Sequence, residues 1–351
     1  MRRTLYGLAF FLAALPALAA RPKAPAPPPP PPQDPARVDV ALIASEPGRA
    51  WGVRVTNAGL VPLRVVADAR LLSFDLTPAA GGPAVRCALP ADMTPSSDAE
   101  RAIVLVPGRS YTEGFDPRLY CFGVKETAAL VPGAQATPHY GFGGRGTGSP
   151  FVVIPLAPDG TDRSTLPSSV RLLHGAAVTV PAPAVPAAAA APPAAAPLEA
   201  DPVRVRVTLA DRIDFDHIAE HTLTVTLHND GDRPLRTLLL PGTVGFLVTT
   251  PGGVTVHCGL STSLNPIAEL LGSLAPHGRA DITVQPEATC PSDTFDTAGL
   301  YVVKPRFDTR HLGQGAAGVT LFRGEVVGTP SLLRLHTGPV LRALPKPDPA
   351  P

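Results

Sequence analysis

The sequence is poor in aromatic residues and carries no excess of charge of either sign. It contains 1 Trp, 5 Tyr and 12 Phe among 351 residues, so any core must be built mainly from Val, Leu and Ala. Lys plus Arg number 30, and Asp plus Glu number 29. This balance gives no net positive field that would attract nucleic acid or an anionic membrane surface. It therefore argues against both of those classes of binding protein.

Long apolar runs are also missing, apart from one at the N-terminus. Residues 1–20 combine Arg2 and Arg3, an apolar stretch over residues 5–15, and the small residues Ala17-Leu18-Ala19. This order is typical of a secretory signal peptide that is cleaved before Ala20 or shortly after it. No cysteine follows the cleavage region, so no lipid anchor is expected. We predict a periplasmic or secreted chain with no transmembrane segment after cleavage.

The sequence does contain a stretch that occurs twice. Residues 53–87 recur as residues 225–258, and Phe74 matches Phe246 at a spacing of 172 residues. Further matching blocks follow in the same order in each copy. A repeat of this length, roughly that of one domain, indicates a duplicated domain.

The last matching block contains a histidine in each copy. Pro167-Ser168 leads to His174-Gly175, and Pro330-Ser331 leads to His336. We match His174 with His336 on this basis and interpret both as turn residues that follow a strand.

Only four cysteines are present, and none has the CxxC or Cys/His spacing of a zinc site. Export places them in an oxidising compartment, where disulfides form. Four cysteines allow three pairings, and the duplication selects the one with a bond inside each copy. We predict Cys87–Cys121 and Cys258–Cys290, which join residues at similar separations.

Composition divides the chain into segments. After the signal peptide (1–20), a proline-rich spacer covers 21–36, and proline tracts of this kind form semi-rigid extended chains. The predicted segments that follow are domain 1 at 37–180, an Ala/Pro-rich linker at 181–202, domain 2 at 203–340 and a disordered tail at 341–351.

Within each copy, apolar and polar residues alternate with a period of two. Val38, Val40 and Leu42 form one such series, and Trp51 with Val53 begins another. Alternation of this kind is the mark of a half-buried strand. Glycine and proline turns separate such runs about every 8–12 residues, a spacing typical of a sandwich. The sequence therefore predicts an all-β chain of two tandem antiparallel β-sandwiches.

One motif matches a catalytic signature by its letters. His217, Glu220 and His221 form H-x-x-E-H, the zinc-binding pattern of inverted zincins, which requires a helix to place both imidazoles on one face. Here the motif lies between two predicted strands, with Asp214 and Asp216 just before it. We interpret the segment as a solvated loop and predict no catalytic residue and no metal site. His217 and His221 remain the weak metal candidates.

A second stretch, residues 142–149 (FGGRGTGS), is rich in glycine. A phosphate-binding P-loop requires Lys followed by Ser or Thr and then a helix, whereas Pro150 and a predicted strand follow here. We interpret it as a surface loop at which a binding surface would lie.

The order of motifs in domain 1 resembles the immunoglobulin-like sandwiches of bacterial exported proteins. The pattern runs from Asn57-x-Gly59 through Pro62-Leu63 and Phe74 to Leu105-Val-Pro107-Gly108, and its order is similar to the proteinase-inhibitor type of this fold. The resemblance implies tandem immunoglobulin-like β-sandwiches. The Trp between two cysteines that antibody domains carry is missing.

These features lead to two functional hypotheses. The first is a non-catalytic exported protein, without cofactor, that acts as a binding or spacer module for a protein or glycan partner at the cell envelope. The alternative is a secreted proteinase inhibitor, or else a metal-binding protein or metalloenzyme that uses His217, Glu220 and His221.

Overall fold

The computed structural model describes residues 36–96, 101–142, 150–157, 169–183, 204–219, 221–259, 270–310, 312 and 321–337. We refer to 36–183 as the N-terminal half and 204–337 as the C-terminal half. The predicted signal peptide, nearly all of the proline-rich spacer, most of the Ala/Pro linker and the tail lie outside the described residues. Glu220 and most of the glycine-rich stretch, residues 143–149, lie outside them as well.

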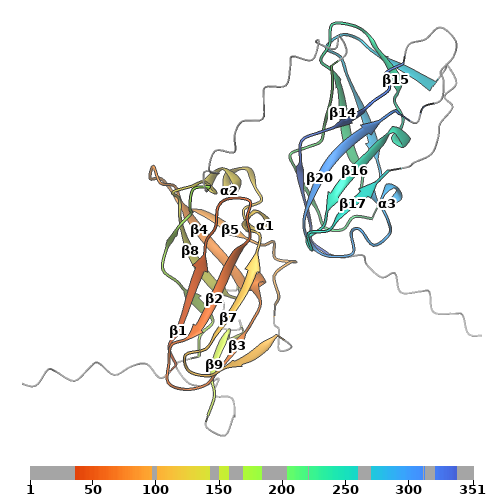
Figure 1. Cartoon of the computed structure of the whole chain (residues 1–351). Coiled ribbons are helices and arrows are strands. Elements are labelled where there is room, and N and C mark those ends of the chain that lie inside the picture. Colours follow the sequence, from red (N-terminus) through yellow and green to blue (C-terminus); the bar gives the residue numbers. More distant parts are fainter. Residues whose placement is uncertain are drawn as a thin grey trace, which may run out of the picture.

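The described chain is mostly β-strand, as the sequence predicts (Figure 1). The strands of the N-terminal half are β1 (Val38–Ile43), β2 (Trp51–Asn57), β3 (Leu63–Val66), β4 (Leu72–Thr77), β5 (Val85–Ala88), β6 (Ala102–Leu105), β7 (Ser110–Phe115), β8 (Gln135–Gly141), β9 (Val153–Pro155), β10 (Leu172–His174) and β11 (Val178–Thr179).

The strands of the C-terminal half are β12 (Val205–Thr208), β13 (Arg212–Phe215), β14 (Leu223–Asn229), β15 (Leu235–Leu238), β16 (Val244–Thr249), β17 (Thr255–Cys258), β18 (Leu271–Leu274), β19 (Arg279–Val284), β20 (Gly299–Asp308), β21 (Glu325–Val327) and β22 (Ser331–Leu335). The helices are the short α1 (Pro117–Tyr120), α2 (Val124–Ala129) and α3 (Pro286–Thr289), with single 3-10 turns η1 (Ala69–Leu71) and η2 (Pro241–Thr243). No helix in the described residues is both long and apolar enough to cross a membrane.

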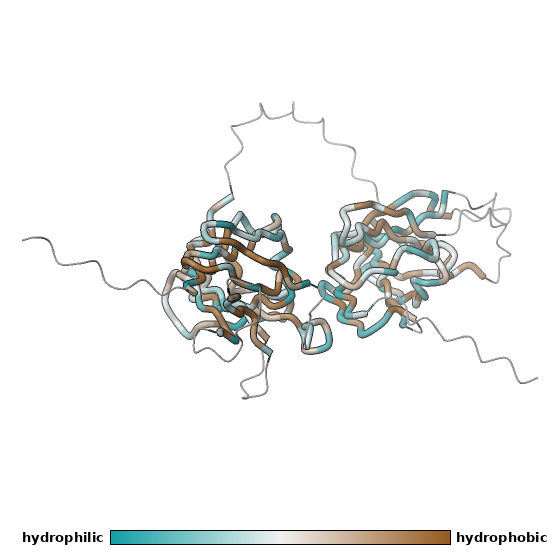
Figure 2. The backbone as a smooth tube through the Cα atoms, turned by 90° about the horizontal axis from the view of Figure 1, so that it is seen from below, coloured by the Kyte–Doolittle hydropathy of each residue, from teal (hydrophilic) through white to brown (hydrophobic). Residues whose placement is uncertain are grey.

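Each sheet of the described chain takes its strands from one half. The N-terminal half has the sheets β1-β2-β7, β10-β8-β4-β5 and β6-β3-β9, and β11 also pairs with β8. The C-terminal half has β12-β14-β19, β13-β22-β20-β16-β17 and β15-β18, and β21 also pairs with β20. Two separate apolar clusters of buried residues lie between these sheets. Figure 2 shows apolar and polar stretches of backbone in both halves.

Burial along the strands follows the alternation in the sequence. In β2, Trp51, Val53, Val55 and Asn57 are buried, whereas Arg54 between them is exposed. In β14, Leu223, at the position that matches Trp51, is also buried. Because side chains of a strand point to opposite faces in turn, this pattern places one face of each strand in a core.

Corresponding strands of the two halves have the same register. Phe74 of β4 pairs with Cys87 of β5, and Phe246 of β16 pairs with Cys258 of β17. Tyr140 of β8 pairs with the first residue of β4, and Phe307 of β20 pairs with the first residue of β16. Cys87 therefore corresponds to Cys258, and Tyr140 to Phe307.

This register shows that the match of His174 with His336 is wrong. The residue before His174 pairs with Tyr140, and β21 pairs the residue before Val327 with Phe307. His174 therefore corresponds to Val327. The glycine that follows each of these residues confirms the assignment, because both glycines are close to a backbone oxygen. A Cβ added at Gly175 would lie 2.3 Å from the Val40 oxygen, and one added at Gly328 would lie 2.4 Å from the Val207 oxygen. His336 follows β22 and belongs to a feature of the C-terminal half alone.

That feature is β13, which lies between β12 and β14, whereas the corresponding described segment between β1 and β2 contains no strand. β13 pairs in parallel with β22, and Phe215 lies opposite Leu335. The other strand pairs in the described residues are antiparallel. The sequence-based prediction of purely antiparallel sheets is therefore wrong for this edge of the C-terminal half. A parallel neighbour needs no hairpin with its partner, so the short-range turn signals in the sequence do not show it.

Both predicted cysteine pairs are disulfide-bonded. The Cα–Cα distance is 4.6 Å for Cys87–Cys121 and 4.3 Å for Cys258–Cys290. In each half the bond connects a strand, β5 or β17, to the residue that follows a short helix, α1 or α3. The bonds thus hold the same two positions of the fold together in both halves.

A fully buried asparagine occupies the same position in each half. Asn57 Nδ2 donates to the Val61 and Leu105 carbonyls at 2.9 and 2.7 Å, and Asn57 Oδ1 accepts from Gly59 N–H at 3.0 Å. Asn229 makes the same kinds of hydrogen bond, to the loop that follows β14 and to the turn that follows β18. The side chain holds the loop after β2 against the end of β6.

We expect Asn57→Ala to lower the free energy of unfolding of the N-terminal half by about 2–3 kcal/mol. The substitution removes the three hydrogen bonds of the Asn57 side chain, one of them to the buried Leu105 carbonyl, and a buried group left without a partner costs about 1–3 kcal/mol. Urea unfolding measures the change. Thr56→Ala on the exposed side of the same strand is the control, with an expected change within about 0.5 kcal/mol. Equal effects of the two variants would contradict the structural role of Asn57.

Candidate functional site

The H-x-x-E-H residues do not form the helical arrangement of a zincin. His217 and His221 lie in the irregular segment between β13 and β14. Their ring centroids are 5.3 Å apart, and the His221 ring stacks on Phe215 at 4.1 Å. Glu220 lies outside the described residues. The two imidazoles are therefore not placed by a helix at i and i+4, as zinc proteases require.

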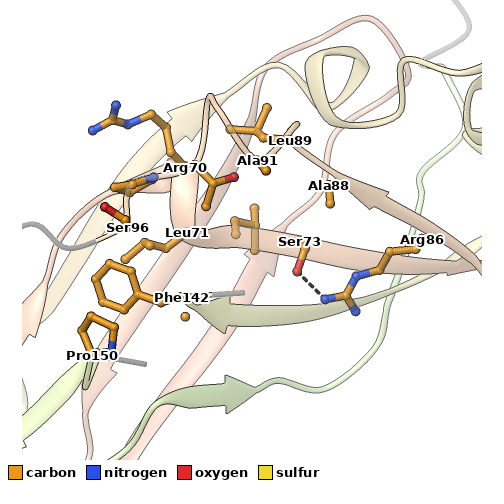
Figure 3. Close-up of a pocket in the computed structure, with 14 residues that line it drawn as sticks. Arg70, Leu71, Ser73, Arg86, Ala88, Leu89, Ala91, Ser96, Phe142 and Pro150 are labelled. Carbon is orange, nitrogen blue, oxygen red and sulfur yellow. Dashed lines mark hydrogen bonds between the residues drawn. The ribbon is translucent and has the colours of Figure 1, made fainter. Parts of the chain in front are cut away.

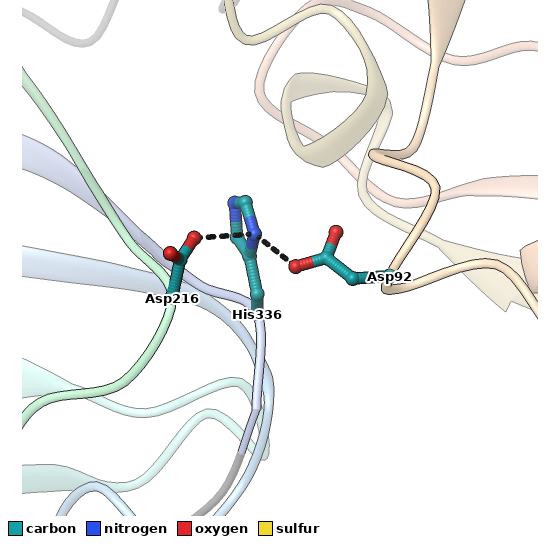
Figure 4. Close-up of side chains that lie close together, drawn as sticks. All are labelled: Asp92, Asp216 and His336. Atoms are coloured by element: carbon teal, nitrogen blue, oxygen red, sulfur yellow. Dashed lines mark hydrogen bonds and ion pairs between the residues drawn. The ribbon is translucent and has the colours of Figure 1, made fainter.

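A different set of side chains meets at one point. Asp92, Asp216 and His336 are the one group of three or more His, Cys, Asp or Glu in the described residues whose potential ligand atoms all lie within 4.8 Å of one another (Figure 4). His336 Nδ1 lies 2.7 Å from Asp92 Oδ2 and 3.3 Å from Asp216 Oδ1. The His336 side chain is 10% exposed. We call these three residues the junction cluster.

The backbone positions the two members of the junction cluster in the C-terminal half. Asp216 directly follows β13, and His336 directly follows β22. The parallel pairing continues past both strands, because His336 N–H donates to the Phe215 carbonyl at 3.0 Å and Thr337 N–H to the Asp216 carbonyl at 3.0 Å. Asp92 comes from the N-terminal half, in the turn after β5. The cluster therefore joins three segments that are distant in sequence.

Two further charged residues support His336. His336 Nε2 lies 2.8 Å from Asp214 Oδ1, and Arg334 Nε donates to the same oxygen at 2.9 Å. Partial burial raises the pKa of Asp214, but the hydrogen bonds from Arg334 and His336 outweigh burial, so this pKa lies below its ordinary value of 3.8. Asp214 is therefore held as a carboxylate that faces the imidazole.

Arg334 also contacts the N-terminal half. Its Nη1 donates to the Leu119 carbonyl at 3.2 Å, and its guanidinium lies 4.3 Å from the centre of the Phe122 ring. Nearby, Asp116 and Leu119 face Pro251 and Leu300 across a cavity of about 360 Å³. The two halves thus meet at polar and aromatic contacts around the junction cluster.

Asp214 and Asp216 were named from the sequence as neighbours of His217 and His221. The structure brings both of them to His336 instead, the residue that the match between the two copies interprets as a turn histidine. Asp92 was not named at all. The signal that could have shown the cluster is the segment between β12 and β14, since an element present in one copy alone has no duplicated structural role.

A second histidine pair lies on the sheet of the N-terminal half. His139 of β8 and His174 of β10 face each other with Nδ1 atoms 2.8 Å apart, and His139 Nε2 lies 2.9 Å from Asp75 Oδ2. Arg86 also contacts Asp75, at 3.1 Å. His174 thus takes part in a chain of polar contacts. Val327, at the equivalent position of the C-terminal half, has no polar side-chain atom and cannot make such contacts.

The N-terminal half also contains a groove of about 550 Å³ (Figure 3). Leu71, Leu89 and Phe142 contribute apolar surface to it, and Ser73 and Arg86 contribute polar groups. Arg86 Nη2 donates to Ser73 Oγ at 2.6 Å. The groove thus combines apolar walls with a few oriented polar groups, as ligand sites do.

Two described residues at the ends of the glycine-rich stretch contribute to the groove. Phe142 and Pro150, the described residues on either side of residues 143–149, both line it. The described residues that flank the predicted surface loop are therefore part of the groove wall.

Comparisons with known proteins give no family for this chain. No protein-family model matches it, and no curated protein matches it at a significant level. Among solved structures, the putative ApaA protein from Bordetella pertussis matches over 43% of this chain and 98% of its own at 17% identity, with a TM-score of 0.22. The class 5 fimbriae chaperone CfaA matches over 84% of this chain and 99% of its own at 8% identity, with a TM-score of 0.21.

Red sea bream transglutaminase matches over 85% of this chain and 31% of its own at 11% identity, with a TM-score of 0.20. Similarity at these scores carries no argument about fold or function. The all-β architecture rests on the strands and sheets described above.

Proposed function

We propose that the chain is a non-catalytic exported protein of two tandem immunoglobulin-like domains that acts as a binding or spacer module of the cell envelope or secretome. The observation that carries this proposal is the kind of residue that the two halves have in common. Each repeats a disulfide at the same register and a fully buried asparagine in the same loop. These are groups that stabilise a fold, and none of them is an acid, base or nucleophile of the kind that an active site needs.

The groove of the N-terminal half supports a binding role. Its volume of about 550 Å³ lies within the range of ligand sites, about 300–1,000 Å³. The apolar surface of Leu71, Leu89 and Phe142, together with the Arg86 guanidinium, suits an extended peptide segment of a protein partner or a glycan. The predicted proline-rich spacer and Ala/Pro linker would hold such a domain away from a surface.

Export is tested by expressing the full chain with a C-terminal tag in a bacterium and separating the cell fractions. We expect processed protein in the periplasm or medium, with a mature N-terminus at Ala20 or shortly after it. We also expect faster migration without reductant, because two disulfides keep the denatured chain compact. Unprocessed protein with free thiols in the cytoplasm would contradict the proposal.

The absence of catalysis is tested with His217→Ala. Because His217 is not held by a helix, we expect this surface substitution to change the free energy of unfolding by no more than about 0.5 kcal/mol. We further expect peptidase and esterase assays to give the same background values for both proteins. A hydrolase activity of the parent protein that His217→Ala abolishes would instead support the metalloenzyme alternative.

A further inference from the structure

The junction cluster brings electron-pair donors together at one point. His336 Nε2 lies 2.8 Å from Asp214 Oδ1, and a carboxylate accepts but does not donate hydrogen bonds. Nε2 can therefore donate its ring hydrogen to Asp214, and in that tautomer of the neutral imidazole Nδ1 is the nitrogen with a free lone pair. That lone pair faces Asp92 Oδ2 at 2.7 Å and Asp216 Oδ1 at 3.3 Å. A proton on Nδ1 or a cation among the three atoms removes the repulsion between their lone pairs, and a metal ion that binds here would displace that proton.

The spacing of these atoms is close to that of a metal site. Ligand atoms about 2.0–2.1 Å from a tetrahedral zinc ion are separated by about 3.3 Å. The Nδ1–Asp216 distance already has this value at 3.3 Å, whereas the Nδ1–Asp92 distance of 2.7 Å has to open by roughly half an ångström. Asp92 is on a turn of the other half with its side chain 46% exposed, so this small shift is available to it.

The surroundings of His336 are those of a metal-ligating histidine. Such a residue usually donates its second ring N–H to a carboxylate, which fixes the ring orientation and makes the other nitrogen a better ligand. Asp214 is the carboxylate that contacts the second ring nitrogen of His336, and Arg334 fixes Asp214 by hydrogen bonds to its carboxylate. The backbone of His336 is fixed by its bond to Phe215. The ligand set is therefore oriented before any ion binds.

We propose that Asp92, Asp216 and His336 bind one divalent ion of the zinc type, with water as a fourth ligand, and that the ion links the two halves of the chain. Two carboxylates balance the charge of a divalent cation. The imidazole favours zinc over calcium or magnesium, which prefer ligand sets made of oxygen alone. The proposal goes beyond the binding or spacer role, because it assigns a metal site that controls how the halves are held together.

The proposed ligands come from both halves, so a bound ion would connect the two halves. Asp216 and His336 belong to the C-terminal half and Asp92 to the N-terminal half. An ion bound by all three would favour the arrangement in which Arg334 contacts Leu119 and Phe122. We therefore expect zinc to bring the two halves of the mature chain closer together in solution.

The test is a calorimetric titration of the chelator-treated mature chain with zinc chloride at neutral pH. We expect one ion per chain. His336→Ala should weaken binding by more than about 100-fold, since even residues that only support a ligand are worth about 10–100-fold. Asp92→Asn should weaken it by at least about 10-fold. Because Asp92 is in an exposed turn, this variant keeps the fold, which the thermal unfolding temperature of the metal-free protein verifies.

His217→Ala and His139→Ala are the matched controls, because each removes a histidine outside the junction cluster, and both should bind zinc as the parent does. Small-angle scattering should show a shorter maximum dimension on addition of zinc for the parent but not for Asp92→Asn.

Lack of binding, or binding that survives His336→Ala, would overturn the site, and full affinity in Asp92→Asn would overturn the link between halves. None of these outcomes bears on export or on the lack of hydrolase activity, so the two proposals fail separately.

Discussion

Removal of the Cys87–Cys121 bond is expected to lower the free energy of unfolding of the N-terminal half by about 3.5–4 kcal/mol. The bond closes a loop with a sequence separation of 34 residues, and the loop-closure entropy of the unfolded chain gives this magnitude. Both sulfurs are buried, with Cys87 0% and Cys121 1% exposed, so Ala replaces each of them without leaving an exposed apolar group. Urea unfolding of Cys87→Ala/Cys121→Ala measures the loss.

The matched variant is Cys258→Ala/Cys290→Ala, whose loop has a separation of 32 residues and should cost nearly the same amount in the other half. Because the apolar clusters of the two halves are separate, each variant should shift one unfolding transition and leave the second in place. A single transition that both variants shift equally would show that the halves unfold as one unit.

The second large effect is expected from Phe74→Ala, at about 3–5 kcal/mol for a buried Phe that leaves a cavity. Phe74 is fully buried. Its ring centre lies 5.6 Å from that of Trp51, 6.2 Å from Phe115 and 6.0 Å from Tyr120. It is therefore the centre of an aromatic group in a chain with few aromatic residues. Calorimetry or urea unfolding measures the change.

Phe74→Leu is the control for that variant. Leu fills most of the same volume, so the expected loss falls to about 1.5 kcal/mol or less. Trp51 fluorescence provides a local signal, since the ring lies next to the substituted position. A Phe74→Ala variant as stable as Phe74→Leu would mean that the core collapses around the gap, and it would contradict the close packing that the structure shows.

Much of the fold could be predicted from the sequence because its signals are local. Alternation in β2 and β14 marks the buried face of each strand, and burial follows it residue by residue. The short helices α1 and α3 were not predicted, since each has only four residues, beginning with Pro, and carries no helical periodicity. The pattern Asn265-Pro266 before Ile267-Ala-Glu-Leu-Leu271 predicts a short helix with Asn265 as its cap, but Leu271 begins strand β18, and residues 265–269 lie outside the described residues.

The candidate site was predicted least well, and the reason is again physical. His174 and His336 have similar neighbours in sequence, yet strand pairing places His174 opposite His139 on β8 and His336 beyond the end of β22. Sequence spacing cannot distinguish these cases, because one or two residues gained or lost in a loop change which strand position a residue occupies.

The sequence by itself determined the all-β class, the two-fold repeat and the disulfide pairs, since strand alternation is a local property and the repeat limits the cysteine pairings. Only the tertiary structure decided that Asp92, Asp216 and His336 meet. Their meeting depends on a parallel strand pair, β13 with β22, between segments 120 residues apart, and on contact between the two halves. Parallel pairing and contact between halves are set by backbone hydrogen bonds and packing across the whole chain, and neither has a short-range signature in the sequence.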